Sequence, residues 1–205
     1  MTDSIQVLRD KVLFSGKLID IASRTLRVSR EGVETVYSIE VARRPPGVRI
    51  LVHNAGKYLL LKEFRSELGR WDYRLAGGKI FESQSQHLAF LVSGDDILDA
   101  ASGAVVAEAR EELGIKVHSA TILRKSSAGA TIDWDLYFFQ VLSFEEIPQG
   151  PSPESTELLV AEWHGHTSVL ELIKSGEFSE DRSIGLLLQD MLQRGILQAN
   201  DNQTA

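Results

Sequence analysis

The chain has 205 residues, a length that fits one ordinary domain or one domain with a small appendage. Hydrophobic residues make up 43% and charged residues 25% of the sequence, which is typical of a globular protein and not of a disordered one. The 22 basic and 29 acidic residues leave a net charge of −7, which argues against sequence-independent binding to nucleic acid. Cysteine is absent, which excludes disulfides, thiolate metal sites and a cysteine nucleophile.

The hydropathy pattern gives no sign of a membrane protein. No segment approaches the roughly 18 consecutive apolar residues of a spanning helix. The N-terminus lacks the basic and then apolar pattern of a secretory signal. We therefore expect a cytoplasmic protein with neither a membrane nor a nucleic acid as its partner.

The first third of the chain is rich in expected strands. Three segments mix β-branched with polar residues and predict strands at Val12–Ile19, Thr25–Arg30 and Thr35–Val41, with a turn at Arg30-Glu31-Gly32. Pro45-Pro46-Gly47 breaks this pattern, so we expect an N-terminal β-strand region over residues 1–45 and a main domain over 46–205. Val48–His53 and Tyr58–Phe64 then predict a hairpin.

The rest of the chain mixes helices and strands. The glycine turn Leu75–Lys79 precedes a polar segment from Glu82 to about Asp96 and a helix over Leu98–Leu113, which Gly114 ends. We expect further strands at Ile115–Leu123, Leu136–Phe144 and Leu158–Trp163, and helices near Ser168–Ser175 and Ser183–Arg194. This order predicts an α+β fold, an α/β/α sandwich with a mixed sheet.

The helix over Leu98–Leu113 carries acidic residues on an unexpected face. At about 100° per residue, Glu108 and Glu112 fall inside the apolar arc and Glu111 lies at its border. Exposed acids would lie opposite that arc, and two half-buried carboxylates one turn apart repel each other unless a cation compensates them. A hard cation such as Mg²⁺ or Mn²⁺ would do so; pairing with arginine or lysine from elsewhere is the alternative.

The glycines at 77 and 78, ahead of this helix, let the backbone approach a ligand and offer carbonyl oxygens. Together with the helix they resemble the Nudix hydrolase signature. Gly78 matches its opening glycine, and the run Glu108–Ile115 matches its end position for position. The resemblance implies that Glu108, Glu111 and Glu112, with the Gly77 carbonyl, bind Mg²⁺ or Mn²⁺ and act in catalysis.

Three departures from the signature stand in this sequence. Ala107 occupies the position of an arginine that orients the glutamates, and Asp99 occupies the position of the first glutamate. The third departure is a longer spacing, because residues 79–98 separate Gly78 from Asp99. We expect this insertion to loop out near the site, where it would shape the substrate pocket, cover it or contact a second subunit.

Residues outside the signature resemble the ADP-ribose pyrophosphatase branch of the family. The carriers of this resemblance are the early strands, Lys62–Arg65 and Gly69-Arg70-Trp71, and more loosely Glu180–Ile184. The resemblance implies metal-dependent cleavage of a small nucleoside diphosphate sugar into a nucleoside monophosphate and a sugar phosphate. It also implies a homodimer formed through the N-terminal strands.

Further site residues follow from the same resemblance. Glu154 and Glu157 are candidates for the general base, or else ordinary loop acids. Arg65 and Arg70 would clamp phosphate, and Gly78 and Lys79 would lie beside it; surface charge and a plain turn are the alternatives. Trp71 or Phe64 would stack on a base, or else fill the core. His164 and His166 have the spacing of a metal pair, but structural histidines are the simpler interpretation.

Two other functions stay open. The Ala107 and Asp99 departures favour a catalytically weak nucleotide-binding module of the same fold. The insertion would suit an enzyme for another diphosphate compound, such as a nucleoside triphosphate, a dinucleoside polyphosphate or coenzyme A. Metal-dependent turnover and a substrate panel distinguish these functions.

Overall fold

The computed structural model describes residues 3–153, 155 and 158–198. The chain divides into two compact units, each assembled from separate segments of the sequence. Unit 1 takes the N-terminal part through Gly47, with Lys79–Ala101 and Lys125–Tyr137. Unit 2 takes Val48–Gly78, Ser102–Arg124 and the chain from Phe138 onward. The domain boundary expected between residues 45 and 46 stays a prediction.

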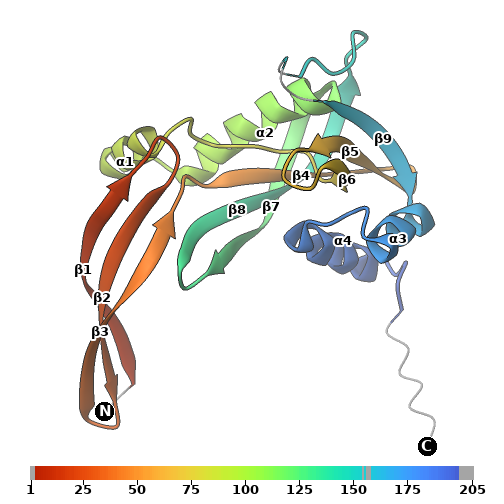
Figure 1. Ribbon diagram of the computed structural model, residues 1–205. Coiled ribbons are helices and arrows are strands. Elements are labelled where there is room, and N and C mark those ends of the chain that lie inside the picture. The colour runs from red at the N-terminus through yellow and green to blue at the C-terminus, as the bar shows by residue number, and fades with distance from the viewer. Residues whose placement is uncertain (1–2, 154, 156–157, 199–205) are drawn as a thin grey trace, which may run out of the picture. The chain divides into compact units, whose positions relative to one another are not determined.

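Unit 1 is built on an antiparallel sheet of three long strands, β1 (Ser4–Ser15), β2 (Asp20–Arg30) and β3 (Val33–Arg43) (Figure 1). The β2–β3 turn lies at the expected place, with Glu31 at φ 50° and Gly32 at φ 82°. Two positive φ angles in succession are typical of the tight hairpin turn that matches strand twist. β1 begins well before the expected Val12, and all of its residues are exposed.

The insertion also belongs to unit 1, and it contains a helix that the sequence did not predict, α1 (Gln84–Ser93). The Ser83 side chain caps its first turn by accepting a hydrogen bond from the Gln86 N–H. Gly94 ends the helix in the left-handed conformation. Serine and glutamine dilute the apolar pattern of this segment, so its capping residues are the clearest helical signal.

Four elements have residues in both units: β4 (Gly47–Asn54), of which only Gly47 belongs to unit 1, α2 (Ile97–Leu113), β7 (Ile115–Gly129) and β8 (Ile132–Glu146). β7 pairs with β8 and extends beyond the expected end at Leu123. The start of β8 pairs in parallel with β3 through Ala42–Ile132 and Arg43–Asp133. Because the β1–β2 and β2–β3 pairs are antiparallel, the sheet is mixed, as predicted.

Unit 2 contains β4 (Gly47–Asn54), β5 (Lys57–Arg65), β6 (Arg70–Arg74), β9 (Leu159–Gly165), α3 (His166–Ser175) and α4 (Asp181–Gln193). β5 pairs antiparallel with β4, β6 and β9. The short, charged β6 was not predicted. The other strands and helices of this unit match the expected ones, with small shifts at their ends.

The core of unit 2 centres on β4, where Val48, Ile50, Leu51 and Val52 are fully buried. Further core residues come from β5, β8 and α4, among them Leu60, Phe138, Leu187 and Met191. Burying a side chain of this size stabilises a fold by about 1.5–3 kcal/mol. The same core fixes the first residues of β4, which border the glycine turn that carries the candidate site.

The fold class is the predicted one: α+β, with a mixed sheet, helices and preceding N-terminal strands. Among the residues that the structure describes, no helix combines the length and the apolar character needed to cross a membrane.

Candidate functional site

The buried face of α2 includes two of the predicted glutamates. Val105, Ala109 and Leu113 are buried along this face, and Glu112 lies with them at 9% exposure. Glu108, one turn earlier, is half-buried, whereas Glu111 is exposed. The predicted helix geometry is therefore confirmed: two carboxylates lie on the apolar side of an amphipathic helix, and the third lies at its border.

The Gly77-Gly78 turn meets these carboxylates directly. The Gly77 N–H donates a hydrogen bond of 2.7 Å to Glu112 Oε2. Gly77 has a φ of +138°, and a Cβ at this position would collide with the backbone of Val48. A Cβ at Gly78 would overlap the Glu108 carboxylate. Both glycines are thus required for the close approach of the loop to Glu108 and Glu112.

The donor set of this turn suits a hard divalent cation, since its two carboxylates are placed side by side on a backbone cradle. The set is incomplete as it stands. Within the described part of the chain, no three acidic or histidine side chains are grouped closely enough to hold a metal ion. Glu108 and Glu112 are the two carboxylates at this turn that could hold a cation.

Arg49 and Glu180 form a buried ion pair next to the same turn. Arg49, at 8% exposure, places Nη2 2.8 Å from Glu180 Oε1 and donates from Nη1 to the Gly77 carbonyl at 3.1 Å. Burial by itself raises the pKa of Glu180, but Arg49 and the Ser183 hydroxyl outweigh it and bring the pKa to about 2. The backbone of Gly77 is therefore held on both sides of its Cα, by Arg49 at the carbonyl and by Glu112 at the N–H.

Neither member of this pair was predicted as a site residue. Arg49 interrupts the apolar run of β4, and a charge inside a buried strand signals a specific partner. Glu180 lies in the stretch Glu180–Ile184, which the sequence singled out without assigning it a role.

Comparison with known proteins finds similar chains among solved structures. No family model matches the sequence, and no curated protein matches it. Among solved structures, one similar chain is an ADP compounds hydrolase, with a TM-score of 0.65 over 93% of this chain and 95% of that chain. Sequence identity is 19%, so the likeness concerns the fold. The chain has the Nudix fold.

Two more predicted residues of the Nudix-fold chain, Arg65 and Arg70, lie opposite each other on β5 and β6. Arg65 contacts Glu63 at 2.9 Å and donates from Nε to Glu67 at 2.7 Å. Arg70 donates to the Gly176 carbonyl at 2.7 Å. Both guanidinium groups thus have protein partners here, and their role in holding phosphate stays a prediction.

The aromatic and lysine predictions have separate outcomes. Trp71 packs edge-on against Phe64 with ring centroids 5.8 Å apart. The Trp71 side chain is 43% exposed, so it does not fill the core. Lys79 contacts Glu82 at 2.8 Å across an exposed turn. Glu154 and Glu157, the candidate bases, lie outside the described residues.

His164 and His166, the two histidines with the spacing of a metal pair, have different partners. His166 Nε2 lies 3.3 Å from Nε2 of His53 on β4, with the two ring planes 12° apart. His164 instead contacts Glu162 at 3.3 Å and Ser168 at 3.0 Å. The two residues thus have separate partners, and the choice between a metal pair and structural histidines stays a prediction.

The two substituted positions of the signature, Ala107 and Asp99, lie on the exposed side of α2. Ala107 is exposed and Asp99 is exposed in the first turn of the helix. The missing arginine at position 107 therefore leaves the Glu112 contact with Gly77 intact, because the backbone N–H of Gly77 orients that carboxylate.

Proposed function

We propose that this chain is a divalent-metal-dependent hydrolase that cleaves the pyrophosphate bond of ADP-ribose or a related nucleoside diphosphate sugar. The products would be a nucleoside monophosphate and a sugar phosphate. The observation that carries the proposal is the contact of the Gly77-Gly78 turn with Glu108 and Glu112, in a fold shared with an ADP compounds hydrolase.

Mg²⁺ or Mn²⁺ is the proposed cofactor, with Glu108, Glu112 and the exposed Glu111 as its carboxylate ligands. The Gly77 carbonyl accepts one hydrogen bond from Arg49, and its second lone pair can serve as a further oxygen ligand. A bound divalent cation would neutralise the pyrophosphate and lower the pKa of a water molecule. Arg49 and the Gly77 N–H hold the ligand atoms in place before substrate arrives.

The remaining roles are assigned by chemistry. Arg65 and Arg70 lie together on the β5–β6 hairpin, where their guanidinium groups suit bidentate contacts to phosphate oxygens. Trp71 on the same hairpin has an exposed ring that would contact the substrate, and Gly78 and Lys79 would lie beside the phosphates. Glu154 or Glu157 would accept a proton from the attacking water.

A second copy of the chain is the proposed partner. Ile5, Val7, Val12, Leu13 and Phe14 of β1 are each at least 50% exposed, which is unusual for apolar side chains in a regular strand. Pairing through β1–β3 would cover them in a homodimer. The proposal includes neither nucleic acid nor membrane as a partner, and the cytoplasmic location stays a prediction.

A substrate panel tests this function. Purified protein with Mg²⁺ or Mn²⁺ is incubated with ADP-ribose, other nucleotide sugars, nucleoside triphosphates, dinucleoside polyphosphates and coenzyme A, and products are separated by chromatography. We expect preferential release of AMP from ADP-ribose or of the monophosphate from another nucleotide sugar. Preference for a triphosphate, a dinucleotide or coenzyme A would change the substrate class. No turnover, with metal-independent nucleotide binding, would leave a binding module.

A further inference from the structure

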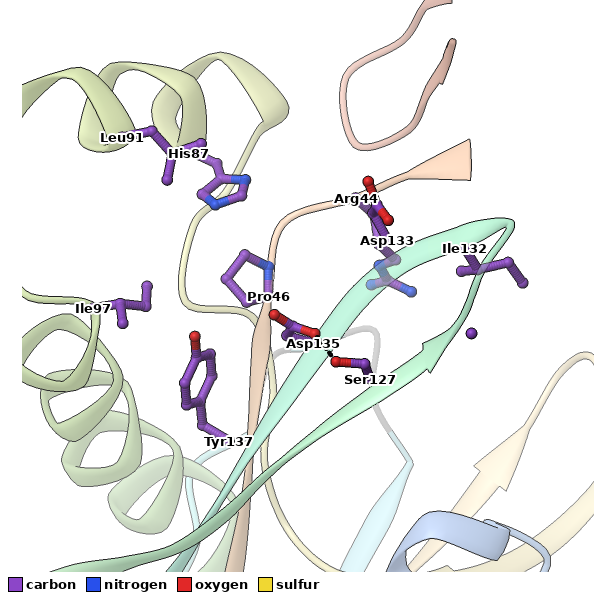
Figure 2. Close-up of a pocket in the computed structure, with 11 residues that line it drawn as sticks. Arg44, Pro46, His87, Leu91, Ile97, Ser127, Ile132, Asp133, Asp135 and Tyr137 are labelled. Atoms are coloured by element: carbon purple, nitrogen blue, oxygen red, sulfur yellow. Dashed lines mark hydrogen bonds between the residues drawn. The ribbon is translucent and has the colours of Figure 1, made fainter. Parts of the chain in front are cut away.

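Unit 1 contains a pocket of about 370 Å³ that the predicted site residues do not line (Figure 2). α1 of the insertion supplies His87 and Leu91, and the opposite side comes from β8, with Asp135 and Tyr137. Figure 2 shows His87 and Tyr137 pointing toward the space between these elements. The insertion therefore builds one wall of a cavity; whether it shapes the substrate pocket, covers it or contacts a second subunit stays a prediction.

The walls of the pocket suit a flat ring. His87 stacks on Phe81 with ring centroids 5.3 Å apart and planes 23° apart, which fixes the orientation of the imidazole. Pro46, Leu91 and Ile97 add apolar surface around the same space. A planar heterocycle would gain aromatic contact and apolar burial in this setting.

The polar lining favours a ligand that donates hydrogen bonds. Asp135 accepts from Ser127 at 2.6 Å and from Lys125 at 3.1 Å. A carboxylate has about four acceptor sites, so further donors can bind it. Asp133, a second carboxylate of the lining, accepts from Arg24 at 2.8 Å. Lys125 and Arg24 balance the charges of these two carboxylates, so the preference rests on the spare acceptor sites of Asp135, which favour an uncharged, amino-bearing ring.

His87 is a further polar residue of the lining. Its Nδ1 is buried and has no hydrogen-bond partner among the described residues. Burial lowers the pKa of the imidazole, against a smaller opposing effect of Asp135, so the ring is neutral at pH 7. Because the protein covers this nitrogen, the ring of the neutral imidazole, and not its Nδ1, is what a ligand in the pocket would contact.

We propose that this pocket binds an amino-substituted nucleobase, with His87 and Tyr137 beside the ring and Asp135 accepting hydrogen bonds from the amino group. The choice of a nucleotide as the ligand rests on the proposed function; the preference for an amino group rests on the pocket. His87 and Leu91 of the insertion would then contact the base.

Binding of nucleoside monophosphates tests this assignment without any turnover. AMP, GMP, IMP and ribose 5-phosphate are titrated calorimetrically into the wild-type protein in the presence of a chelator. IMP is the matched ligand, because it is a purine without an exocyclic amino group. A hydrogen bond to a charged acceptor is worth about a factor of ten or more, so we expect AMP and GMP to bind at least about tenfold more tightly than IMP.

Three variants separate the roles of the lining. Asp135→Asn should abolish the preference over IMP, and His87→Ala should weaken all three purines about equally and leave ribose 5-phosphate unchanged. Val92→Ala, at an 89% exposed position of the same helix, is the control and should bind as the wild type does. Circular dichroism checks that each variant is folded.

The outcomes distinguish this assignment from the proposed function. If the wild type hydrolyses a nucleotide sugar but the Asp135 and His87 variants bind AMP as it does, the pocket assignment is overturned and the hydrolase stands. If the amino preference is present and depends on Asp135 while no substrate is cleaved, the pocket stands and the hydrolase fails. Absence of nucleotide binding to the wild type also overturns the assignment.

Discussion

The Gly77 N–H donates to Glu112 Oε2 at 2.7 Å, and this contact joins the glycine turn to α2. The bond fixes a carboxylate that is 9% exposed, on a helix whose neighbouring positions are apolar. The Gly77 carbonyl accepts from Arg49, so the backbone of this one residue links Glu112 with the Arg49–Glu180 ion pair. The site thus depends on residues that lie far apart in the sequence.

Alanine at each glycine of the turn should have a different effect. Gly78→Ala places a methyl group on the Glu108 carboxylate, which can move, so activity should fall strongly with little loss of stability. Gly77→Ala meets the fixed backbone of Val48 at φ +138° and should lower the free energy of unfolding by about 1–3 kcal/mol. Urea denaturation and initial rates measure the two effects.

Gly103→Ala is the matched control for these substitutions. A Cβ at this exposed position of α2 meets nothing within 4 Å, and alanine should stabilise the helix by about 0.5–1 kcal/mol. If Gly78→Ala retained full activity, the close approach of this loop to Glu108 would have no catalytic importance.

Removal of one partner from the Arg49–Glu180 pair should destabilise unit 2. Arg49→Met leaves the Glu180 carboxylate buried without its main compensating charge, which costs about 3–5 kcal/mol for pairs of this kind. The double variant Arg49→Met/Glu180→Gln should recover part of that loss, because no uncompensated charge is left. Equal unfolding free energies for the wild type and the single variant, measured in urea, would show that the pair contributes nothing.

Stability should decline in two steps as the pH falls. Burial lowers the pKa of the His53 imidazole. The charges of Arg194 and His166 lower it further, and Asp190 opposes them. The unfolded chain therefore binds a proton at this histidine more readily than the folded chain does below about pH 6.5. Glu180 has a pKa of about 2 in the fold against 4.5 as its ordinary value. Its contribution is therefore complete above about pH 4.5 and is lost as the pH falls toward 2.

Thermal unfolding between pH 8 and pH 3 would resolve the two steps. His53→Gln should reduce the upper step, and Glu180→Gln should reduce the lower one. A stability that stays constant from pH 7 to pH 5.5 in the wild type would contradict the histidine contribution. The His87 imidazole, whose pKa is also lowered by burial, adds to the upper step in the same direction.

The sequence predicts local features of this site better than long-range ones. The helical repeat predicts the position of Glu108 and Glu112 on the buried face of α2. The glycine pair predicts a turn whose backbone can approach a ligand, and the structure adds that this turn lies against Glu108 and Glu112. The Arg49–Glu180 pair joins residues 131 positions apart, and periodicity carries no information about such a contact. Only the charge of Arg49 within an apolar strand could have indicated it.

The missed elements have a similar explanation. The first four residues of α1 are all polar, Gln84, Ser85, Gln86 and His87, and its apolar residues include the 89% exposed Val92. Its pocket-lining role depends on β8, which lies more than thirty residues further along the chain. Sequence pattern predicts faces within an element, and tertiary packing decides which faces meet.

The most direct test of the account measures AMP release from ADP-ribose in Mn²⁺ by wild type and by Glu112→Gln. The amide keeps an acceptor for the Gly77 N–H and removes the charge, so the fold should be retained and the rate should fall by about a hundredfold or more. Glu171→Gln, at an exposed position of α3, is the control. We predict turnover that a chelator abolishes and that Glu112→Gln nearly eliminates. Equal rates for Glu112→Gln and the wild type would contradict the assignment of this site.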